Sequence, residues 1–354
     1  MTDSSTKPIV LHLGDPVKYN TKLYAELEST FTVIRPSLEE RQRDAFLSAL
    51  RNKKWGDFSA VLRPWWATGG EMGRWDQELI PLLPTSLTVF ASAGAGYDWA
   101  DVDTLAEHGI LYCNGASASS EAVADMAIYH IISVFRNMQW TNMAARTGDP
   151  EAFVDAHLRA QFTAHNPAGQ TLGVVGLGNI GYKIAHKARA AFGMEIIYYD
   201  VLPKPAAQEA AVGARRCDTL DELLALADCT VVAAPGQAGR RLIDREQIAR
   251  MKKGSRLVNV ARGSLVSEEA VADALESRHL HAVGLDVFED EPHPSPRLVK
   301  NRQATLTCHT AGGALETAVG FERLAIENVL KVLAGQQPLT PVNQHMLKQR
   351  TIKP

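Results

Sequence analysis

The sequence is short of the features that mark several specialised classes of protein. Its 354 residues carry a formal net charge of only -3 and a pI near 6.4, so they create no strong field for a polyanion or an anionic membrane. No apolar run approaches a membrane span, and the N-terminus lacks the basic and apolar regions of a secretory signal. We therefore expect neither nucleic acid nor a membrane as a partner.

Cysteine is scarce as well. The four cysteines lie far apart, with no CxxC pair and no spacing typical of a metal site. This pattern favours a reduced, cytoplasmic protein with no bound metal. Internal repeats and low-complexity tracts are also absent. What remains is an ordinary globular composition, with 45% hydrophobic and 22% charged residues.

Short apolar runs alternate with amphipathic segments along the whole chain, which is typical of βαβ units and parallel sheets. Two blocks of such runs lie on either side of a long helical segment, so a chain of 354 residues is expected to form two domains. The runs lie at 9–14, 31–34, 59–62, 87–92 and 109–113 in the first block, and at 171–175, 194–199, 229–234, 255–261, 281–288 and 304–308 in the second.

The segment between the blocks has apolar residues at helical spacing from Val123 to Phe135, followed by an irregular stretch containing "GDP" and "HNPAGQ". A last amphipathic segment, about Ala314 to Leu333, has the pattern of a helix that returns to the first domain. We predict an α/β protein with two doubly wound parallel-sheet domains, of the Rossmann or flavodoxin type, and a cleft between them.

A glycine loop opens the second block. Gly176, Gly178 and Gly181 follow the predicted strand "TLGVV" in a GxGxxG pattern, and a helical segment comes next. The first glycine permits the turn, the second lets the backbone approach a pyrophosphate, and the third lets helix and strand pack closely. A tight turn without a ligand is the alternative. The strand, loop and helix order favours a dinucleotide site.

Asp200 ends the next predicted strand, 19 residues beyond Gly181. A carboxylate there accepts hydrogen bonds from a ribose diol and repels a 2'-phosphate, which favours NAD(H) over NADP(H). Lys204 is close enough in sequence to soften that repulsion. The alternative is an acid that caps a turn at the end of the strand.

Three further side chains follow strands of the second block. Arg262 follows "LVNVA", Glu291 lies three residues beyond "GLDVF", and His309 follows "TLTC". Open α/β sheets bind ligands beyond the carboxyl ends of their strands, so the three are expected on the edge that carries the glycine loop. Taken singly, a surface charge, a solvated turn and a rim histidine explain them equally well.

The order of "GLGNIG", "VNVARGSLV", "GLDVFEDEP" and "CHTAGG" resembles the NAD-dependent D-isomer-specific 2-hydroxyacid dehydrogenases over nearly the whole chain. Within that family, "YYDV" and "AHNPAG" resemble the D-mandelate dehydrogenase branch. The resemblance implies reversible hydride transfer between NADH and a 2-keto acid that is bulky or aromatic. A glyoxylate or hydroxypyruvate reductase, and an NADH-sensing corepressor without turnover, are the alternatives.

The resemblance also assigns roles that suit the chemistry of the residues. His309 would exchange the proton of the carbonyl oxygen, and Glu291 would orient the imidazole and favour its protonated form. Arg262 would hold the substrate carboxylate with its planar guanidinium. Asp286 matches an acid near the nicotinamide carboxamide, although structural capping explains it nearly as well. The implied cofactor-binding positions are Gly176, Gly178, Asn179, Ile180, Gly181, Asp200, Pro235, Ala261, Asp286 and Gly312.

The first block is expected to bind substrate. Gly94, Ala95 and Gly96 follow a predicted strand and would offer backbone amides to the carboxylate, or form an ordinary turn. Trp65 and Trp66 would line an apolar pocket, with ordinary core or surface packing as the alternative. We therefore predict a substrate domain of residues 1–116 plus 313–354 and an NAD-binding domain of residues 117–312.

The helix around residues 122–136 has an apolar face that family members use in a two-fold homodimer, although a core helix joining two domains gives the same pattern.

Three departures from the family pattern stand out. The segment "APGQAGRRLI" lacks the threonine usual after the fourth strand of the cofactor domain, which puts one hydrogen bond at the cofactor's edge in doubt. Cys308 replaces a proline before the histidine, and we expect it to be buried and inert rather than oxidation-sensitive. Asp125 replaces a glutamate on the long helix.

Overall fold

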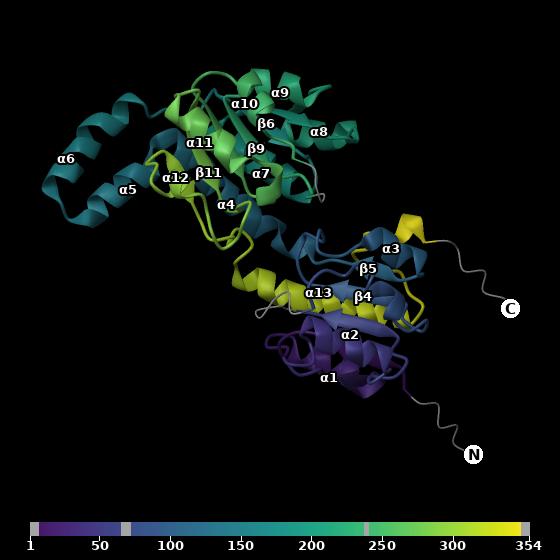
Figure 1. Ribbon diagram of the computed structural model, residues 1–354. Coiled ribbons are helices and arrows are strands. Elements are labelled where there is room, and N and C mark those ends of the chain that lie inside the picture. The colour runs from purple at the N-terminus through teal and green to yellow at the C-terminus, as the bar shows by residue number, and fades with distance from the viewer. Residues whose placement is uncertain (1–6, 65–71, 237–240, 348–354) are drawn as a thin grey trace, which may run out of the picture. The chain divides into compact units, whose positions relative to one another are not determined.

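The chain divides into two compact units. Unit 1 comprises Met1–Ser119 and Ala314–Pro354, and unit 2 comprises Ser120–Gly313. The computed structural model describes residues 7–64, 72–236 and 241–347 (Figure 1). Within those residues, no helix has both the length and the apolar character that crossing a bilayer requires.

Unit 1 contains a five-stranded parallel sheet in the order β2-β1-β3-β4-β5. This is the order of flavodoxin-like doubly wound folds. Apolar residues of helices α1 and α13 form the core on one face of the sheet, and those of α2, α3 and the short η1 form it on the other. The elements are β1 (Ile9–His12), α1 (Thr21–Thr30), β2 (Thr32–Ile34), α2 (Arg43–Arg51), β3 (Ala60–Arg63), η1 (Ile80–Leu82), β4 (Val89–Ser92), α3 (Val102–Glu107), β5 (Leu111–Cys113), α13 (Leu315–Leu333) and η4 (Gln344–Met346).

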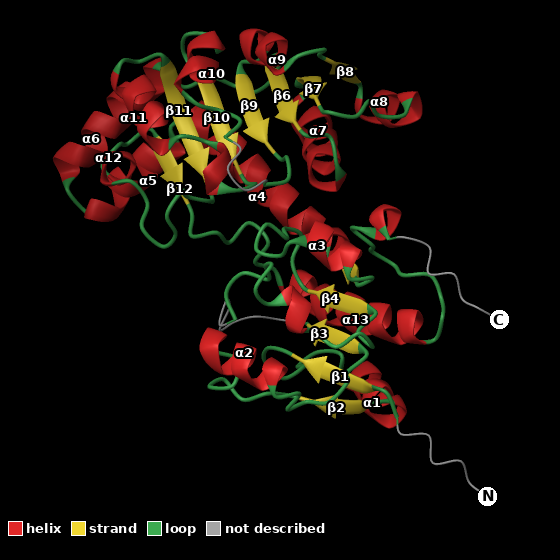
Figure 2. Cartoon of the chain, turned by 45° about the vertical axis from the view of Figure 1, so that its right-hand side comes forward, coloured by secondary structure: helices red, strands yellow, loops and turns green. Residues whose placement is uncertain are grey.

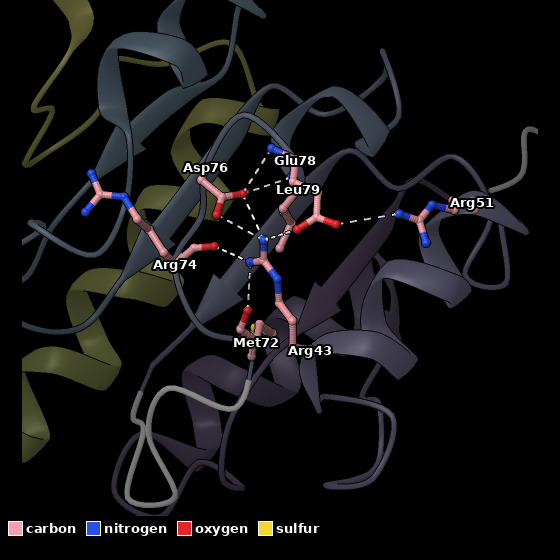
Figure 3. Close-up of polar contacts among 7 residues, drawn as sticks. All are labelled: Arg43, Arg51, Met72, Arg74, Asp76, Glu78 and Leu79. Carbon is pink, nitrogen blue, oxygen red and sulfur yellow. Dashed lines mark hydrogen bonds and ion pairs between the residues drawn. The ribbon is translucent and has the colours of Figure 1, made fainter.

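Arg43 on α2 ties the segment that precedes η1 to the body of unit 1 (Figure 3). Its guanidinium donates to Asp76 at 2.9 and 3.0 Å and to Glu78 at 2.8 Å. It also donates to the carbonyl oxygens of Met72, at 3.0 Å, and Arg74. The planar fork of arginine suits this set of acceptors, which a single ammonium group would not satisfy.

Unit 2 contains a seven-stranded parallel sheet in the order β12-β11-β10-β9-β6-β7-β8 (Figure 2). The order reverses beside β6, as in dinucleotide-binding Rossmann folds. The strands are β6 (Thr171–Val175), β7 (Glu195–Tyr199), β8 (Ala214–Arg216), β9 (Cys229–Val232), β10 (Ser255–Asn259), β11 (Leu280–Leu285) and β12 (Ala304–Leu306). Our sequence analysis missed β8, because this edge strand is three residues long and two of them are arginines.

Helices cover both faces of the larger sheet. Apolar residues of α4 and α7 pack on one face, and those of α9, α10, α11 and α12 on the other. The helices are α4 (Ala116–Arg136), α7 (Asn179–Phe192), α8 (Ala206–Val212), α9 (Leu220–Leu226), α10 (Arg245–Arg250), η3 (Gly263–Leu265), α11 (Glu268–Glu276) and α12 (Pro296–Val299). The apolar face of α4 lies in this core, where Ala127 and Ile131 are fully buried. Core packing therefore accounts for its periodicity.

The prediction of an irregular stretch after α4 is confirmed for "HNPAGQ", at 165–170, but was wrong for the part before it, which contains two further helices. They are α5 (Met138–Thr147) and α6 (Pro150–Arg159), followed by η2 (Ala160–Phe162). The "GDP" tripeptide ends α5 and begins α6. Gly148 ends α5 in the left-handed conformation, with φ of 68°, and the Asp149 carboxylate accepts the amide of Glu151 at 2.9 Å. Pro150 then occupies the first helical position, where its missing N–H costs nothing.

Candidate active site

The three glycines of the loop after β6 have three separate structural reasons. Gly176 has φ of +93°, and a Cβ there would lie 3.0 Å from the backbone of Ala233 and Ala234. A Cβ at Gly181 would lie 1.9 Å from the carbonyl oxygen of Gly176, so only glycine lets α7 pack against the loop. A Cβ at Gly178 would meet nothing within 4 Å. The backbone is thus open to solvent at the start of α7, where exposed amides and the helix dipole favour an anion.

Asp200, at the end of β7, reaches back to this loop. Its Oδ2 accepts the amide of Leu177 at 2.9 Å, and its Oδ1 accepts the amide of Leu202 at 3.1 Å. Lys204 forms an ion pair with Oδ2 at 2.9 Å. The carboxylate is therefore held in place beside the glycine loop, and it carries a cation within contact distance.

The three consecutive acids after β11 have three different environments. Glu289 accepts the amide of Glu268 at 2.7 Å, Glu268 accepts the amide of Glu289 at 2.6 Å, and Arg241 pairs with Glu289. Asp290 is exposed, and its carboxylate lies 3.7 Å from His293. Only Glu291 turns toward His309. Glu289 therefore stabilises the local structure, Asp290 is solvated, and only Glu291 is a candidate site residue.

Glu291 and His309 form the pair that the sequence predicted. Glu291 Oε2 lies 2.7 Å from His309 Nδ1, and Glu291 Oε1 accepts the amide of Phe288 at 3.1 Å. A carboxylate only accepts hydrogen bonds at its ionised oxygens, so Nδ1 carries a proton and Nε2 is the ring nitrogen available for proton exchange. The imidazole is about half exposed.

Arg262 follows β10 on a turn fixed by Asn259. The Asn259 side chain donates to the carbonyl oxygen of Arg262 at 2.8 Å and accepts the amide of Ala261 at 3.0 Å. Arg262 Nη1 donates to the carbonyl oxygen of Ala261 at 2.8 Å. A Cβ at Gly236 would lie 2.8 Å from Cγ of Arg262, and one at Gly263 would lie 1.8 Å from the Phe288 carbonyl oxygen. Because residue 236 is a glycine, the Arg262 side chain can pack against it, and because residue 263 is a glycine, the chain can pass close to the backbone of Phe288.

Asp286, which was expected near the cofactor, is fully buried. Its Oδ1 accepts the Thr307 hydroxyl at 2.6 Å and the Thr310 amide at 2.9 Å, and its Oδ2 accepts the Ala311 amide at 2.9 Å. Capping of the turn that carries His309 explains this residue, and a cofactor contact stays a prediction.

The remaining predicted positions are placed as follows. Asn179 is exposed and Ile180 half-buried at the start of α7, and Pro235 is exposed after β9. Gly312 is half-buried, one residue before unit 2 ends at Gly313. These four, like Ala261, stay predictions as cofactor contacts.

In unit 1, Gly94 has φ of +89°, and the carbonyl oxygens of Gly94 and Ala95 accept the Gly115 amide at 2.7 Å and the Asn114 side chain at 2.9 Å. These bonds fix the turn, while carboxylate binding by Gly94, Ala95 and Gly96 stays a prediction. Trp65 and Trp66 lie outside the described residues.

One expectation at this site was wrong: Cys308 is exposed, not buried. It lies in the sharp turn between β12 and His309, where the chain has left the sheet. Our sequence analysis also missed Asn259 and Thr307. No motif marks them. Asn259 contacts the backbone of Ala261 and Arg262, just beyond the end of its own strand, and Thr307 contacts the side chain of Asp286, which folding brings near.

The site has the parts of a nicotinamide-dependent oxidoreductase. The glycine loop after β6, Arg262 after β10, Glu291 after β11 and His309 after β12 all follow the carboxyl ends of strands in one parallel sheet. The open backbone at Gly178 and the fixed acid at Asp200 fit a dinucleotide.

Comparison with known families agrees. The family described as "D-isomer specific 2-hydroxyacid dehydrogenase, NAD binding domain" matches residues 128–311. The chain is 32% identical to glyoxylate reductase 1 of Saccharomyces cerevisiae over 345 residues, which cover 96% of this chain and 95% of that one. The chain belongs to the D-isomer specific 2-hydroxyacid dehydrogenase family, and it is an oxidoreductase with an NAD-binding domain.

Two solved structures are similar over nearly their whole length. The holo form of D-mandelate dehydrogenase from Rhodotorula graminis has a TM-score of 0.91 at 43% identity, covering 96% of this chain and 98% of that one. A glyoxylate reductase from Paecilomyes thermophila has a TM-score of 0.86 at 34% identity, covering 96% and 99%. The predicted family and two-domain α/β fold are thus confirmed.

Proposed function

We propose that this protein is an NAD-dependent D-2-hydroxyacid dehydrogenase that interconverts a bulky or aromatic 2-keto acid, of the benzoylformate type, and its 2-hydroxy acid. The observation that carries the proposal is the 2.7 Å pairing of Glu291 with His309 Nδ1. It fixes the imidazole on the edge of the sheet that also carries the glycine loop. The similarity to D-mandelate dehydrogenase supports the bulky substrate.

In this proposal His309 exchanges one proton. Its Nε2–H donates to the carbonyl oxygen of the keto acid as the alcohol forms, and Nε2 accepts the proton back in the reverse reaction. Glu291 holds the ring by Nδ1 and stabilises the charge of the protonated form. Bound NADH supplies the hydride to the keto carbon.

The substrate carboxylate needs a cation, and Arg262 provides a planar pair of donors. Asn259 and the neighbouring glycines fix the backbone of Arg262, so that its guanidinium starts from a defined position. We propose that the backbone amides of Gly94, Ala95 and Gly96 in unit 1 also bind substrate. The positive φ of 89° at Gly94, directly after β4, supports this, because turns with such glycines can present backbone amides to an anion.

We propose that NAD(H) is preferred over NADP(H). Asp200 is held beside the glycine loop by the amides of Leu177 and Leu202, and its charge opposes a 2'-phosphate. Lys204 reduces that opposition, because its ammonium group lies 2.9 Å from the same carboxylate. The preference should therefore be finite, not absolute.

A panel of 2-keto acids tests the function. With NADH and the purified full chain, we expect kcat/KM for benzoylformate to exceed that for glyoxylate and hydroxypyruvate several-fold, measured by loss of NADH absorbance. The reverse order would identify a glyoxylate or hydroxypyruvate reductase. No turnover with any member, together with retention of a partner in a pull-down that depends on NADH, would identify the corepressor alternative.

We also propose that the protein is a homodimer. The apolar face of α4, the predicted contact surface, is buried in the core of unit 2. The hairpin formed by α5 and α6 (Figure 1) offers a better surface. Each of its helices buries only a single alanine and exposes large apolar side chains. The exposed apolar residues from α5 to η2 are Met138, Met143, Phe153, Val154, Leu158 and Phe162.

Six such side chains amount to several hundred Å² of apolar surface, which approaches the roughly 800 Å² per partner of a stable interface. We propose a second copy of the chain as the partner at this surface, because a two-fold axis pairs the same patch with itself.

We expect light scattering to give twice the 38.6 kDa chain mass, and Phe153→Asp combined with Phe162→Asp to give the monomer. Leu226→Asp, at an exposed apolar residue of α9, is the control. A monomeric wild type would contradict the proposal.

A further inference from the structure

We propose that Thr307 and His130 are positioning residues for His309, which they act on through the carboxylate of Asp286. The proposal rests on the function proposed for His309. It adds a chain of hydrogen bonds that begins on α4 and ends at the turn that aims the imidazole.

The starting point is the backbone of His309. Its φ of 52° is the left-handed conformation, which is unfavourable for a residue other than glycine and is kept here by the surrounding structure. The amide of His309 donates to the carbonyl oxygen of Asp286 at 2.7 Å. The amides of Thr310 and Ala311 donate to the Asp286 carboxylate, both at 2.9 Å. Asp286 therefore holds three consecutive amides of the turn.

The Asp286 carboxylate is itself held by Thr307. The Thr307 hydroxyl donates to Oδ1 at 2.6 Å, so its oxygen is left to accept a hydrogen bond. His130 Nε2 lies 3.0 Å from that oxygen and is the donor. The order of donation is therefore fixed from His130 to Thr307 to Asp286.

The state of His130 suits a fixed donor. Burial lowers its pKa to about 4, so the ring is neutral at working pH. Within the described part of the chain its Nδ1 has no hydrogen-bond partner, which leaves the proton on Nε2. A neutral ring with one proton cannot exchange the roles of its two nitrogens without breaking its bond to Thr307.

Gly284 makes this arrangement possible. A Cβ at Gly284 would lie 2.9 Å from His130 Nδ1 and 3.0 Å from His130 Cβ, so a side chain there would displace the ring. Gly284 is in β11, two residues before Asp286. Glycine is therefore required at position 284 because the His130 side chain, on α4, packs directly against it.

Removing the Thr307 hydroxyl leaves Asp286 with one partner fewer, so the turn no longer holds His309 in one orientation. Thr307→Val should lower kcat about fivefold to tenfold and change the KM for NADH by less than about twofold. Thr307→Ser, which keeps the hydroxyl, should restore kcat to within about twofold. In a His309→Gln background, Thr307→Val should have no further effect on kcat, since the two act as a unit.

A matched control lies two residues before Thr307, in β12. Thr305 Oγ1 lies 2.6 Å from Ser133 Oγ, so Thr305→Val also breaks a buried hydrogen bond between α4 and β12, but one that does not reach Asp286. It should lower Tm about as much as Thr307→Val and leave kcat unchanged. Equal kcat values for the two variants would overturn the proposal.

A second measurement does not need a substrate. The titration of His309 can be followed by NMR of histidine-labelled protein. Thr307→Val should shift its midpoint, and Thr305→Val should not. A shift without any turnover by the wild type would reject the proposed function and keep the positioning chain. Turnover that depends on His309, without any effect of Thr307→Val on either measurement, would reject the chain and keep the function.

Discussion

Replacing His309 with glutamine will lower kcat by about 10²-fold or more, the usual scale for losing an acid-base group. The glutamine side chain fills similar space but cannot exchange a proton at neutral pH. NADH binding, followed by fluorescence titration, should be unchanged, because the cofactor positions after β6 and β7 do not depend on His309. Steady-state assays with the preferred keto acid measure the fall.

The chain offers a matched control for this variant. His293 lies two residues beyond Glu291, is exposed, and contacts only the solvated Asp290 among the acids of this run. His293→Gln should keep the wild-type kcat. Glu291→Gln should fall between the two, because the amide still contacts Nδ1 but no longer stabilises the protonated ring. Wild-type kcat in His309→Gln would end the role given to this residue.

The parallel sheets were predictable because their strands are short and apolar and alternate with helices, which is typical of parallel pairing. The glycine loop was predictable because its GxGxxG spacing stands between a strand and a helix, a local pattern. The turn at Gly176 and the close packing at Gly181 are both visible in the contacts that a side chain would make. Local patterns of this kind depend on few distant residues.

The α5–α6 hairpin shows the limit of local reading. Gly148, Asp149 and Pro150 are loop residues by composition, yet they end one helix and begin the next. Each helix of the hairpin buries only a single alanine, so neither has the wide buried apolar face by which α4 was predicted. The residues that cap the two helices were present in the sequence, and their capping preferences are a better guide to this structure than the loop-like composition of the segment.

Distant contacts account for what the sequence could not predict at the site. Glu289 and Glu291 are the same residue type and lie two residues apart. Glu289 accepts a backbone amide at the start of α11, whereas Glu291 contacts His309. Thr307 acts on the carboxylate of Asp286, which folding brings near, whereas Asn259 acts on the backbone two and three residues further along the chain. The glycines at 236, 263 and 284 are a result of such distant contacts, because a side chain at each position would collide with a segment that is distant in the sequence.

The second large effect is expected at Asp200. The wild type should show a kcat/KM for NADH at least about tenfold above that for NADPH, since a hydrogen bond to a charged group contributes about 1.5–3 kcal/mol. Asp200→Asn should narrow this preference by about tenfold to a hundredfold. The amide oxygen can still accept the Leu177 amide, so the glycine loop keeps its support while the charge that repels a 2'-phosphate is removed.

Lys204 provides the opposite variant. Its ammonium group neutralises part of the Asp200 charge, so Lys204→Met should widen the preference for NADH, mainly by raising the KM for NADPH. The two substitutions should thus move the ratio of kcat/KM values in opposite directions, which a general weakening of cofactor binding would not do. A wild type that prefers NADPH, or two variants that shift the ratio in the same direction, would show that Asp200 supports the loop without selecting the cofactor.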